Sequence, residues 1–411
     1  MRRHAIPSIL AVLLTIPVVG ASAAALPSPL GAGADTEGAR SVAEANNDFG
    51  FALYELVRQS GEENVFFSPA SLSTALAMTY AGARGETATE IRAALGWTLD
   101  DDELHPAVEE LSRALTGEGA ELALASALWG SRGLAFHREF LELAHEHYEA
   151  GFDEVDFAGA PDRARRTINA WVDAQTNHEI AQLLLPGDVD LSTVLVLTHA
   201  VHFKGTWKVR FDDGETRPAA FRVSADREVS VEMMRVRGST FPHFGGEGFQ
   251  LLELPYAGDR ISMLVLLPDE GSDLADLEAS LSADNLARWL SRVQPTRFRS
   301  VEIPRFESST RLGLRDALSR MGISLAFTPS ADFSGMTPSR PAWIDNVFHE
   351  ARVRIDEEGT LAAGSTAVVI KKGPAIREAD IFRADRPFIY LIRDRRSGTV
   401  LFLGRLIDPA A

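Results

Sequence analysis

The side chains in this chain best suited to chemistry are histidines, and their spacing does not suit a metal site. His145 and His147 lie two residues apart in a segment with helical periodicity, so their side chains point in different directions. His199 and His202 lie three residues apart in or beside a strand, and they face opposite sides of it. We therefore expect structural or surface histidines, and we predict no metal site.

Enzyme motifs are also missing from the sequence. His178 and Glu179 begin like a zinc-protease motif, but the second histidine is absent. There is no Gly-x-Ser-x-Gly nucleophile elbow and no Walker phosphate loop. The chain has no cysteine, which excludes a cysteine nucleophile and a thiolate metal site. We predict that the protein is not an enzyme and carries no cofactor.

One segment has unusual conformational character, residues 356–370, with the sequence DEEGTLAAGSTAVVI. Its glycines and small residues tolerate many backbone conformations, so it can form an exposed loop. It has no proline, no charge between Glu358 and Lys371, and a strand-forming end at Ala367–Ile370, so it can also join a sheet. Composition alone leaves two interpretations open, a switch between loop and strand and an ordinary edge strand with a glycine bend.

The composition suits an exported globular protein. Of 411 residues, 45% are hydrophobic and 24% charged, and the formal net charge is −17. Such an acidic chain without a long basic run argues against nucleic acid as a partner. Residues 1–23 resemble a signal peptide, with Arg2 and Arg3 before the apolar run Ile9–Val19 and small residues at Ala21–Ala23. That run is too short to span a bilayer, and we expect no membrane association.

We expect three parts along the chain. These are the signal peptide at 1–23, a leader rich in Ala, Pro, Gly and Ser at 24–40, and one large domain at 41–411. The absence of cysteine and of Asn-x-Ser/Thr sites fits a prokaryotic secreted protein, located extracellularly or in the periplasm.

The periodicities predict an α+β domain with helices first and strands later. One helix starts at Pro69 after Ser68, and another carries a capping box at Thr87-x-x-Glu90 and stops at Gly96. The strand-like runs are Thr193–Thr198, Leu251–Tyr256, Ile261–Leu267, Val301–Phe306 and Val400–Leu406.

Six segments together, in this order, resemble the serpin family over about Ala43 to Pro409. They are NVFFSPASLSTALAMTYAGARGET at Asn64–Thr87, LTHAVHFKGTW at Leu197–Trp207, LPYAGDRISMLVLLP at Leu254–Pro268, ADFSGMT at Ala331–Thr337, VFHEARVRIDEEGT at Val347–Thr360 and RPFIYLIRDRRSGTVLFLGRLIDP at Arg386–Pro409. The resemblance implies an α+β serpin fold: a single domain of about nine helices and three β-sheets, with an exposed reactive-centre loop near the C-terminus.

The resemblance also implies a function, irreversible suicide-substrate inhibition of serine endopeptidases. In that family the protease cleaves the loop, and the cut loop enters the main sheet as a new strand while the protease is still held as an acyl-enzyme. The implied partner is a target serine protease in a covalent 1:1 complex, and we expect the inhibitor itself to be a monomer. The alternative is a non-inhibitory serpin-fold binding protein.

The resemblance assigns the hinge of that loop to Glu357, Glu358, Gly359, Thr360, Ala362, Ala363, Gly364, Ser365 and Thr366. In the family's register the inward-facing positions are Thr360, Ala362, Gly364, Thr366, Val368 and Ile370. None of these is charged or a proline, whereas non-inhibitory members often carry such residues there. The hinge therefore favours the inhibitory interpretation.

Other positions carry over from the family. Ser68, Ser71 and His349 match a polar cluster beneath the point where the main sheet opens, and Trp207 matches the tryptophan at the top of that sheet. His199 stands where the family usually has asparagine, so we hypothesise that sheet opening is pH-sensitive. The acidic stretch Asp100–Glu110 argues against activation by glycosaminoglycans.

The cleaved bond is open among several candidates. The family's usual count from Glu357 reaches Gly373, but a proline follows it and makes a poor substrate. We favour cleavage after Lys372, before Gly373, which suits a trypsin-like pocket. The alternatives are Lys371–Lys372, Ile376–Arg377 and Arg377–Glu378, and the target protease is trypsin-like or subtilisin-like.

Overall fold

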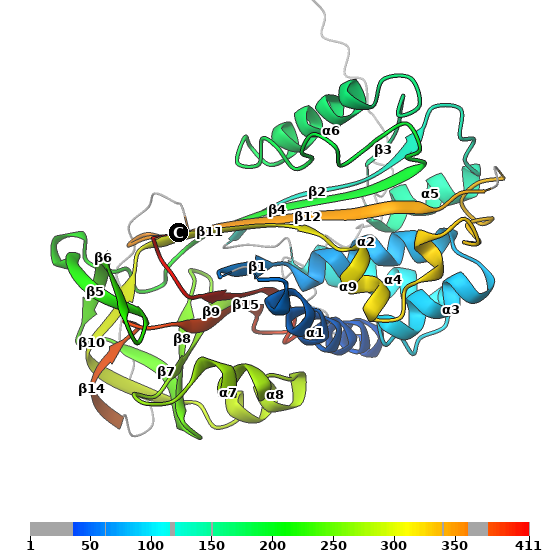
Figure 1. Cartoon of the computed structure of the whole chain (residues 1–411). Helices are drawn as coiled ribbons and strands as arrows, with labels where there is room; N and C mark the ends of the chain where they lie inside the picture. Colours follow the sequence, from blue (N-terminus) through cyan, green and yellow to red (C-terminus); the bar gives the residue numbers. More distant parts are fainter. Residues whose placement is uncertain are drawn as a thin grey trace, which may run out of the picture. The chain divides into compact units, whose positions relative to one another are not determined.

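Two β-sheets form the frame of the protein, and helices pack against them (Figure 1). The computed structural model describes residues 36–61, 63–115, 120–148, 151–338, 341–360 and 377–410. Within these ranges there are nine α-helices, in agreement with the predicted α+β fold. None of the described helices is long and apolar enough to cross a membrane.

The six-stranded sheet is central to the site. Its order is β11–β12–β4–β2–β3, and the short strand β13 also pairs with β4. The bounds are β2 (Ala120–Ser131), β3 (Gly151–Val155), β4 (Leu195–Thr206), β11 (Phe306–Gly313), β12 (Ile344–Ile355) and β13 (Gly359–Thr360). The first nine residues of β4 are all buried, as expected of a strand covered on both faces.

The ten-stranded sheet has the order β1–β16–β15–β9–β8–β7–β10–β6–β5, and β14 pairs with β10. The bounds are β1 (Val65–Phe67), β5 (Arg217–Ser224), β6 (Arg227–Arg237), β7 (Thr240–Gly246), β8 (Phe249–Pro255), β9 (Ile261–Pro268), β10 (Gln294–Pro304), β14 (Arg377–Arg383), β15 (Phe388–Asp394) and β16 (Val400–Leu406). We predicted three sheets, whereas hydrogen bonding joins the described strands into two. The reason is β10, which pairs with β7 through its first residues and with β6 through its last.

The helices lie on both faces of the six-stranded sheet. Figure 1 shows α6 on one face and α1, α2, α4 and α9 on the other. Their bounds are α1 (Glu37–Val57), α2 (Pro69–Gly82), α3 (Gly85–Ala94), α4 (Asp101–Leu115), α5 (Arg138–Tyr148), α6 (Pro161–Gln175), α7 (Leu274–Ala279), α8 (Ala283–Leu290) and α9 (Arg315–Arg320). The main core is on the α2 side, and a second core lies under α6, where Ile168 and Val172 meet Ala125, Val196 and Ala200.

Some local predictions are confirmed. The helix after Ser68 begins at Pro69, and the Ser68 hydroxyl caps it by accepting a hydrogen bond from the Ser71 N–H at 3.2 Å. Gly96 follows the end of α3 with a φ of +65°, which a glycine adopts readily. The leader predicted for residues 24–40 ends earlier than expected, because α1 already starts at Glu37 and buries Ala39.

Two other local predictions are wrong. Helix α3 starts at Gly85, so Thr87 and Glu90 do not form a capping box. Thr87 instead accepts a hydrogen bond from the Asp332 N–H, and Glu90 accepts from the N–H groups of Ser324 and Leu325. The run Val301–Phe306 is not one strand, because β10 ends at Pro304 and β11, in the other sheet, begins at Phe306. In both places contacts distant in sequence decide the local structure.

The side chain of Asn169 ties the segment after α6 to the helix. Its amide donates to the Leu184 carbonyl and its oxygen accepts from the Leu184 N–H, both at 2.8 Å. In an Asn169→Ala variant these buried backbone groups lose their partners, which costs about 1–3 kcal/mol. We expect faster hydrogen–deuterium exchange at residues 180–189, with little change in the control Thr167→Ala on the exposed face of α6. Equal exchange in the two variants would contradict this role.

Candidate functional site

The candidate site is the line along which β12 and β4 meet, which we call the seam. The two strands are parallel neighbours from Ile344 opposite Leu195 to Arg352 opposite His202. Beyond His202, β4 continues to Thr206 and stays paired with β2 along its other edge. The edge of β4 that faced β12 is then free to pair with another strand.

The two residues of β13 occupy that edge. After β12 the chain turns back, with the Asp356 N–H donating to the Gly359 carbonyl at 2.9 Å. Gly359 then lies opposite Thr206, and Thr360 opposite Gly205, in antiparallel pairing. Because Thr360 is nearer the seam than Gly359, a continuation of β13 along β4 would run between β4 and β12. The described hinge therefore has the position and direction that strand insertion requires.

The backbone at Gly359 fits only a residue without a side chain. Its φ is +144°, and a Cβ added there would lie 2.1 Å from the Gly205 carbonyl oxygen. The next residue, Thr360, is fully buried, and its hydroxyl is 3.0 Å from the Tyr256 hydroxyl. The described structure therefore has no room for a side chain at residue 359 and encloses the side chain of residue 360.

Trp207 holds the turn that precedes β13. Its indole N–H donates to the Asp356 carbonyl at 2.9 Å, and its backbone N–H donates to the Glu358 carbonyl at 2.9 Å. The indole also stacks on Tyr256 with ring centroids 4.4 Å apart. The predicted sheet-top tryptophan therefore contacts the first hinge residues directly.

Glu357 anchors the hinge to the rest of the molecule. Its carboxylate is buried and accepts two hydrogen bonds from Arg305, at 2.6 and 3.2 Å, and one from the Thr216 hydroxyl at 2.5 Å. Burial alone would raise the pKa of Glu357, but the bonds from Arg305 and Thr216 keep it below the ordinary value. The carboxylate stays charged and paired at neutral pH.

The remaining loop predictions fall mostly outside the described residues. These are the hinge positions Ala362, Ala363, Gly364, Ser365 and Thr366 and the cleavage candidates Lys371, Lys372, Gly373 and Ile376. Arg377 is described at the backbone level, as the first residue of β14, where it pairs with Thr296 of β10. The choice among the cleavage candidates stays a prediction.

The predicted polar cluster does come together beneath the seam. His199 and His349 are direct cross-strand partners there, with ring centroids 5.6 Å apart. The Nε2 atom of His349 accepts from the Ser68 N–H at 3.0 Å. Ser71 joins only through its backbone N–H, which donates to the Ser68 hydroxyl. The role of this cluster in opening the sheet remains a prediction.

Sequence reasoning missed Ser126 of β2 as a member of this cluster. Its hydroxyl lies 2.8 Å from Nε2 of His199, so the cluster reaches across three strands. The available signal was the position of Ser126 among small apolar residues in a strand-like run, Ala125 and Ala127, where a lone hydroxyl needs a partner.

Both histidines are neutral. Burial lowers the pKa of His199 to about 3. Burial, and after it the neighbouring His199, lower the pKa of His349 well below its ordinary value, although interaction with the His199 backbone acts in the opposite direction. An opened sheet that let water reach these rings would therefore gain affinity for protons.

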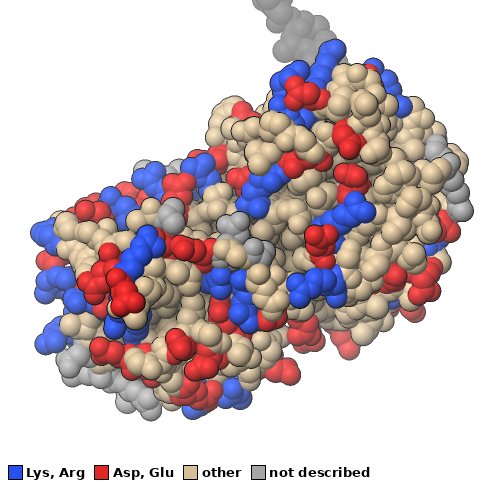
Figure 2. All heavy atoms as spheres, in the orientation of Figure 1, with Lys and Arg blue, Asp and Glu red and all other residues tan. Residues whose placement is uncertain are grey.

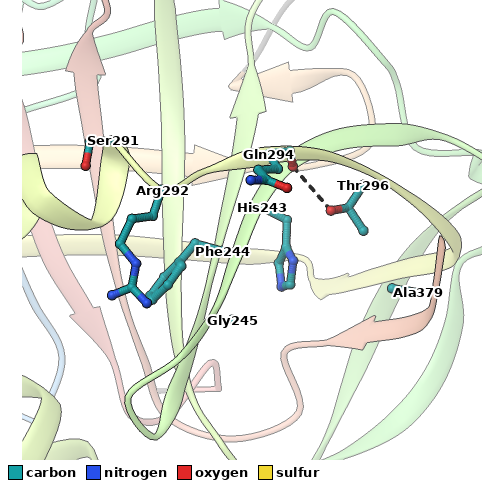
Figure 3. Close-up of a pocket in the computed structure, with 8 residues that line it drawn as sticks. All are labelled: His243, Phe244, Gly245, Ser291, Arg292, Gln294, Thr296 and Ala379. Carbon is teal, nitrogen blue, oxygen red and sulfur yellow. Dashed lines mark hydrogen bonds between the residues drawn. The ribbon is translucent and has the colours of Figure 1, made fainter. Parts of the chain in front are cut away.

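One pocket among the described residues was considered as an alternative, catalytic site. A cavity of about 550 Å³ lies where β7, β10 and β14 meet, and its lining includes His243, Ser291 and Arg292. Figure 3 shows Ser291 at the far side of Arg292, pointing away from the His243 ring, so the two do not form a nucleophile and its base. Among the described residues, no group of His, Asp and Glu could hold a metal ion.

Comparisons with known proteins agree on one family. A family model described as serpin (serine protease inhibitor) matches residues 44–409. An uncharacterised serpin-like protein of Thermococcus kodakarensis is 39% identical, over 90% of this chain and 86% of that protein. Leukocyte elastase inhibitor of Bos taurus is 37% identical, over 89% of this chain and 98% of that protein.

Solved structures give the same picture. Uncleaved ovalbumin has a TM-score of 0.82 at 30% identity, covering 90% of this chain and 100% of its own. Human thyroxine-binding globulin, complexed with its hormone, has a TM-score of 0.83 at 30% identity, covering 91% of this chain and 100% of its own.

The buried histidine pair predicts acid sensitivity. Since His199 has a depressed pKa in the folded state, stability is full above the ordinary histidine pKa of about 6.5 and falls as the pH drops toward the folded value of about 3. One such group removes about 2 kcal/mol of unfolding free energy between pH 7 and pH 5. The His199→Asn variant should not lose this unfolding free energy between pH 7 and pH 5. Its rate of protease inhibition should also depend less on pH between 5 and 8.

Urea unfolding and inhibition rates at each pH provide the measurement. The control is His178→Asn, because His178 is exposed and has a φ of +66°, which asparagine also adopts. If His199→Asn kept the pH dependence of the parent protein, the histidine pair would not be acid-sensitive.

The close approach at Gly359 gives a second prediction. Gly359→Ala must shift backbone atoms of Gly205, Thr206 and Trp207, so we expect β13 to leave β4. The matched control is Gly398→Ala, which has a φ of +77° but no atom within 4 Å of the added Cβ. Exchange of the Trp207 amide should rise in the first variant only. An equal effect in both would mean that backbone strain alone, about 1–2 kcal/mol, accounts for the change.

Proposed function

The chain belongs to the serpin family, and from that premise we propose that it is an irreversible suicide-substrate inhibitor of serine endopeptidases. The chain is not an enzyme, and its relationship to leukocyte elastase inhibitor supports protease inhibition in general. The observation that carries the proposal is β13. It pairs with the free edge of β4 and points along the seam, where a new strand would form.

The chemistry belongs to the attacking protease. Its serine oxygen forms a bond to a loop carbonyl, the peptide bond breaks, and the leaving amine takes a proton. The inhibitor then competes with water for the acyl-enzyme by moving the cut loop into the seam. The inward-facing residues are small from Thr360 to Thr366, and Val368 and Ile370 are β-branched and uncharged, so the segment suits rapid entry between the strands.

The energetics favour insertion. Opening the seam breaks one ladder, the pairing of β12 with β4, while an inserted strand makes two, one on each side. The net gain is one ladder of about a dozen hydrogen bonds, each worth about 1 kcal/mol, so the step releases on the order of 10 kcal/mol. That is large enough to make the step irreversible.

A carrier function without inhibition is the second candidate. It is motivated by the similarity to human thyroxine-binding globulin, which was solved as a complex with thyroxine. The absence of proline and charge from Gly359 to Ile370 favours inhibition over this candidate.

We further propose a trypsin-like or subtilisin-like target and cleavage between Lys372 and Gly373. Lysine before the cut matches a pocket with an acidic floor. We also propose that the protein acts outside the cytoplasm, on the basis of the signal-like residues 1–23.

Incubation with trypsin and with subtilisin, followed by a denaturing gel, tests the proposal. We expect an SDS-stable band near the summed mass, and cleaved protein that melts about 10 °C or more above the intact form. Thr366 faces inward in the family's register, so Thr366→Arg would bury a charge during insertion and should give cleavage without the band, whereas Thr366→Ser should behave like the parent protein. Cleavage of the parent without the band and without added heat stability would indicate the carrier function.

A further inference from the structure

Two histidines lie in the contact between helices α4 and α5, outside the site described above. His105 of α4 is buried, and its Nδ1 atom is hydrogen-bonded to the hydroxyl of Tyr148, a buried residue of α5. His147 of α5 is half-buried, and its Nδ1 atom is 2.6 Å from the carboxylate of Glu109 in α4, which also pairs with Arg113 at 2.6 Å. The two imidazole rings are stacked, with centroids 6.2 Å apart. Each helix thus contributes one histidine and one partner to the contact.

The neighbouring helices bring further charged and titratable groups to His105. Figure 1 shows α2, α3, α4 and α5 gathered in one region at the right of the molecule. Tyr80 of α2 has its ring centroid 6.3 Å from that of His105, and its hydroxyl donates to Asp101 at 2.6 Å. Arg92 of α3 donates to the Tyr80 hydroxyl at 3.0 Å and forms an ion pair with Asp101. Asp101 and Arg92 therefore compensate each other's charge.

His105 is uncharged at neutral pH. Burial lowers the pKa of His105 below the ordinary value, and Asp101 opposes this effect. The positive charges of His147 and Arg92 lower this pKa further. Burial raises the pKa of Tyr148, so its hydroxyl keeps its proton and donates to Nδ1 of His105. A proton added at Nδ1 would remove this acceptor and place a charge in a buried contact.

Helix α4 depends on its packing against the neighbouring helices. Pro106 lies inside it and lacks the N–H that would bond to the Asp102 carbonyl. Leu104, Val108 and Leu111 are buried and belong to the main core. A change in the polar contact with α5 therefore acts on a helix whose own hydrogen bonding is incomplete.

The exposed surface of α4 and α5 is acidic. Figure 2 shows acidic side chains at the lower right of the molecule, where Figure 1 draws α3 and α4. The exposed acids of α4 and α5 are Asp101, Asp102, Glu103, Glu139, Glu142 and Glu146. A histidine that left the buried contact would lie among these carboxylates, which favour the protonated ring.

We infer that the contact between α4 and α5 is an acid-sensitive latch. At neutral pH the uncharged ring of His105 holds the two helices together, and in acid the ring takes up a proton and α4 separates from α5. The inference goes beyond the proposed inhibitory function and does not rest on it.

The direction of the pH effect follows from burial. Since the pKa of His105 is lowered in the docked state, the latch is fully closed above the ordinary histidine pKa of about 6.5 and weakens as the pH falls below it. For a released ring with the ordinary pKa, the ratio of released to docked helix rises by up to about 30-fold between pH 7.5 and pH 5.0.

Hydrogen–deuterium exchange at pH 7.5 and 5.0, corrected for the intrinsic pH dependence of exchange, measures the latch. In the parent protein, protection of residues 101–113 and 138–148 should fall by up to about 30-fold in acid. At pH 5.0 these helices should exchange faster than β4, because they open without the rest of the fold. In His105→Asn the amide oxygen can accept from Tyr148 in place of Nδ1 but does not titrate, so the acid-induced loss should vanish. The matched control is His145→Asn on the exposed side of α5, which should keep the pH dependence of the parent.

A second variant tests the latch if His105→Asn does not fold. His147→Asn keeps a donor for Glu109 but removes the titratable ring beside His105, so the loss of protection should begin at a lower pH than in the parent. The inference is overturned if either variant has the pH dependence of the parent, or if His145→Asn removes it. It is also overturned if α4 and α5 exchange no faster than β4 at pH 5.0, since the helices would then open only when the whole protein unfolds. No protease enters these measurements, so their outcome is independent of the proposed function.

Discussion

The parallel contact between β4 and β12 is the interaction on which the rest of the structure depends. In the proposed mechanism it must be stable enough to keep the sheet closed and weak enough to part when a strand arrives. A parallel ladder suits both demands, since it is slightly less stable per residue than an antiparallel one. On its outer sides each strand is held by antiparallel partners, β2 for β4 and β11 for β12. Between β11 and β2 the seam is therefore the one parallel contact among the described strands, and the hinge pairs at its end.

The hinge depends on anchors that fix where insertion begins. Arg305 and Thr216 hold the Glu357 carboxylate, and Trp207 holds the backbone on either side of it. Arg305 stands directly between β10 and β11, the strands of the two different sheets. The start of the loop is thus tied to the junction of the sheets, and β13 is aligned with β4 before any cleavage. In the proposed mechanism, this alignment would shorten the conformational search of the cut loop.

The sequence alone predicted the position of several strands correctly, but it predicted one helix cap wrongly. Hydrophobic runs located β4, β8, β9 and β16, because burial on both faces leaves a strong local signal. The capping box predicted at Thr87 and Glu90 was wrong, because these side chains accept hydrogen bonds from the N–H groups of Asp332 and Ser324, more than two hundred residues away.

Pairing between strands was the hardest feature to foresee. Nothing in residues 294–304 indicates that β10 bonds to both β6 and β7 and so merges two predicted sheets. The contact of Ser126 with His199 likewise follows from the register of β2 against β4. Both features depend on which strands become neighbours, and that is decided by the packing of the whole domain rather than by local periodicity.

The proposed opening of the seam also involves the segment after α6, which covers it. The segment after α6 packs through Ile180 and Leu184 into the second core, whose sheet residues belong mostly to β2 and β4. Across the seam its bonds are polar, with Arg352 of β12 donating to the Glu179 carbonyl at 2.7 Å and Arg311 of β11 pairing with Asp188. Both contacts are partly exposed to solvent, which weakens them, and each contributes less than the buried apolar cluster. In the proposed opening, β11 and β12 would take these arginines with them, and the cover would lose Phe348 of β12 but keep its apolar contacts with β2 and β4.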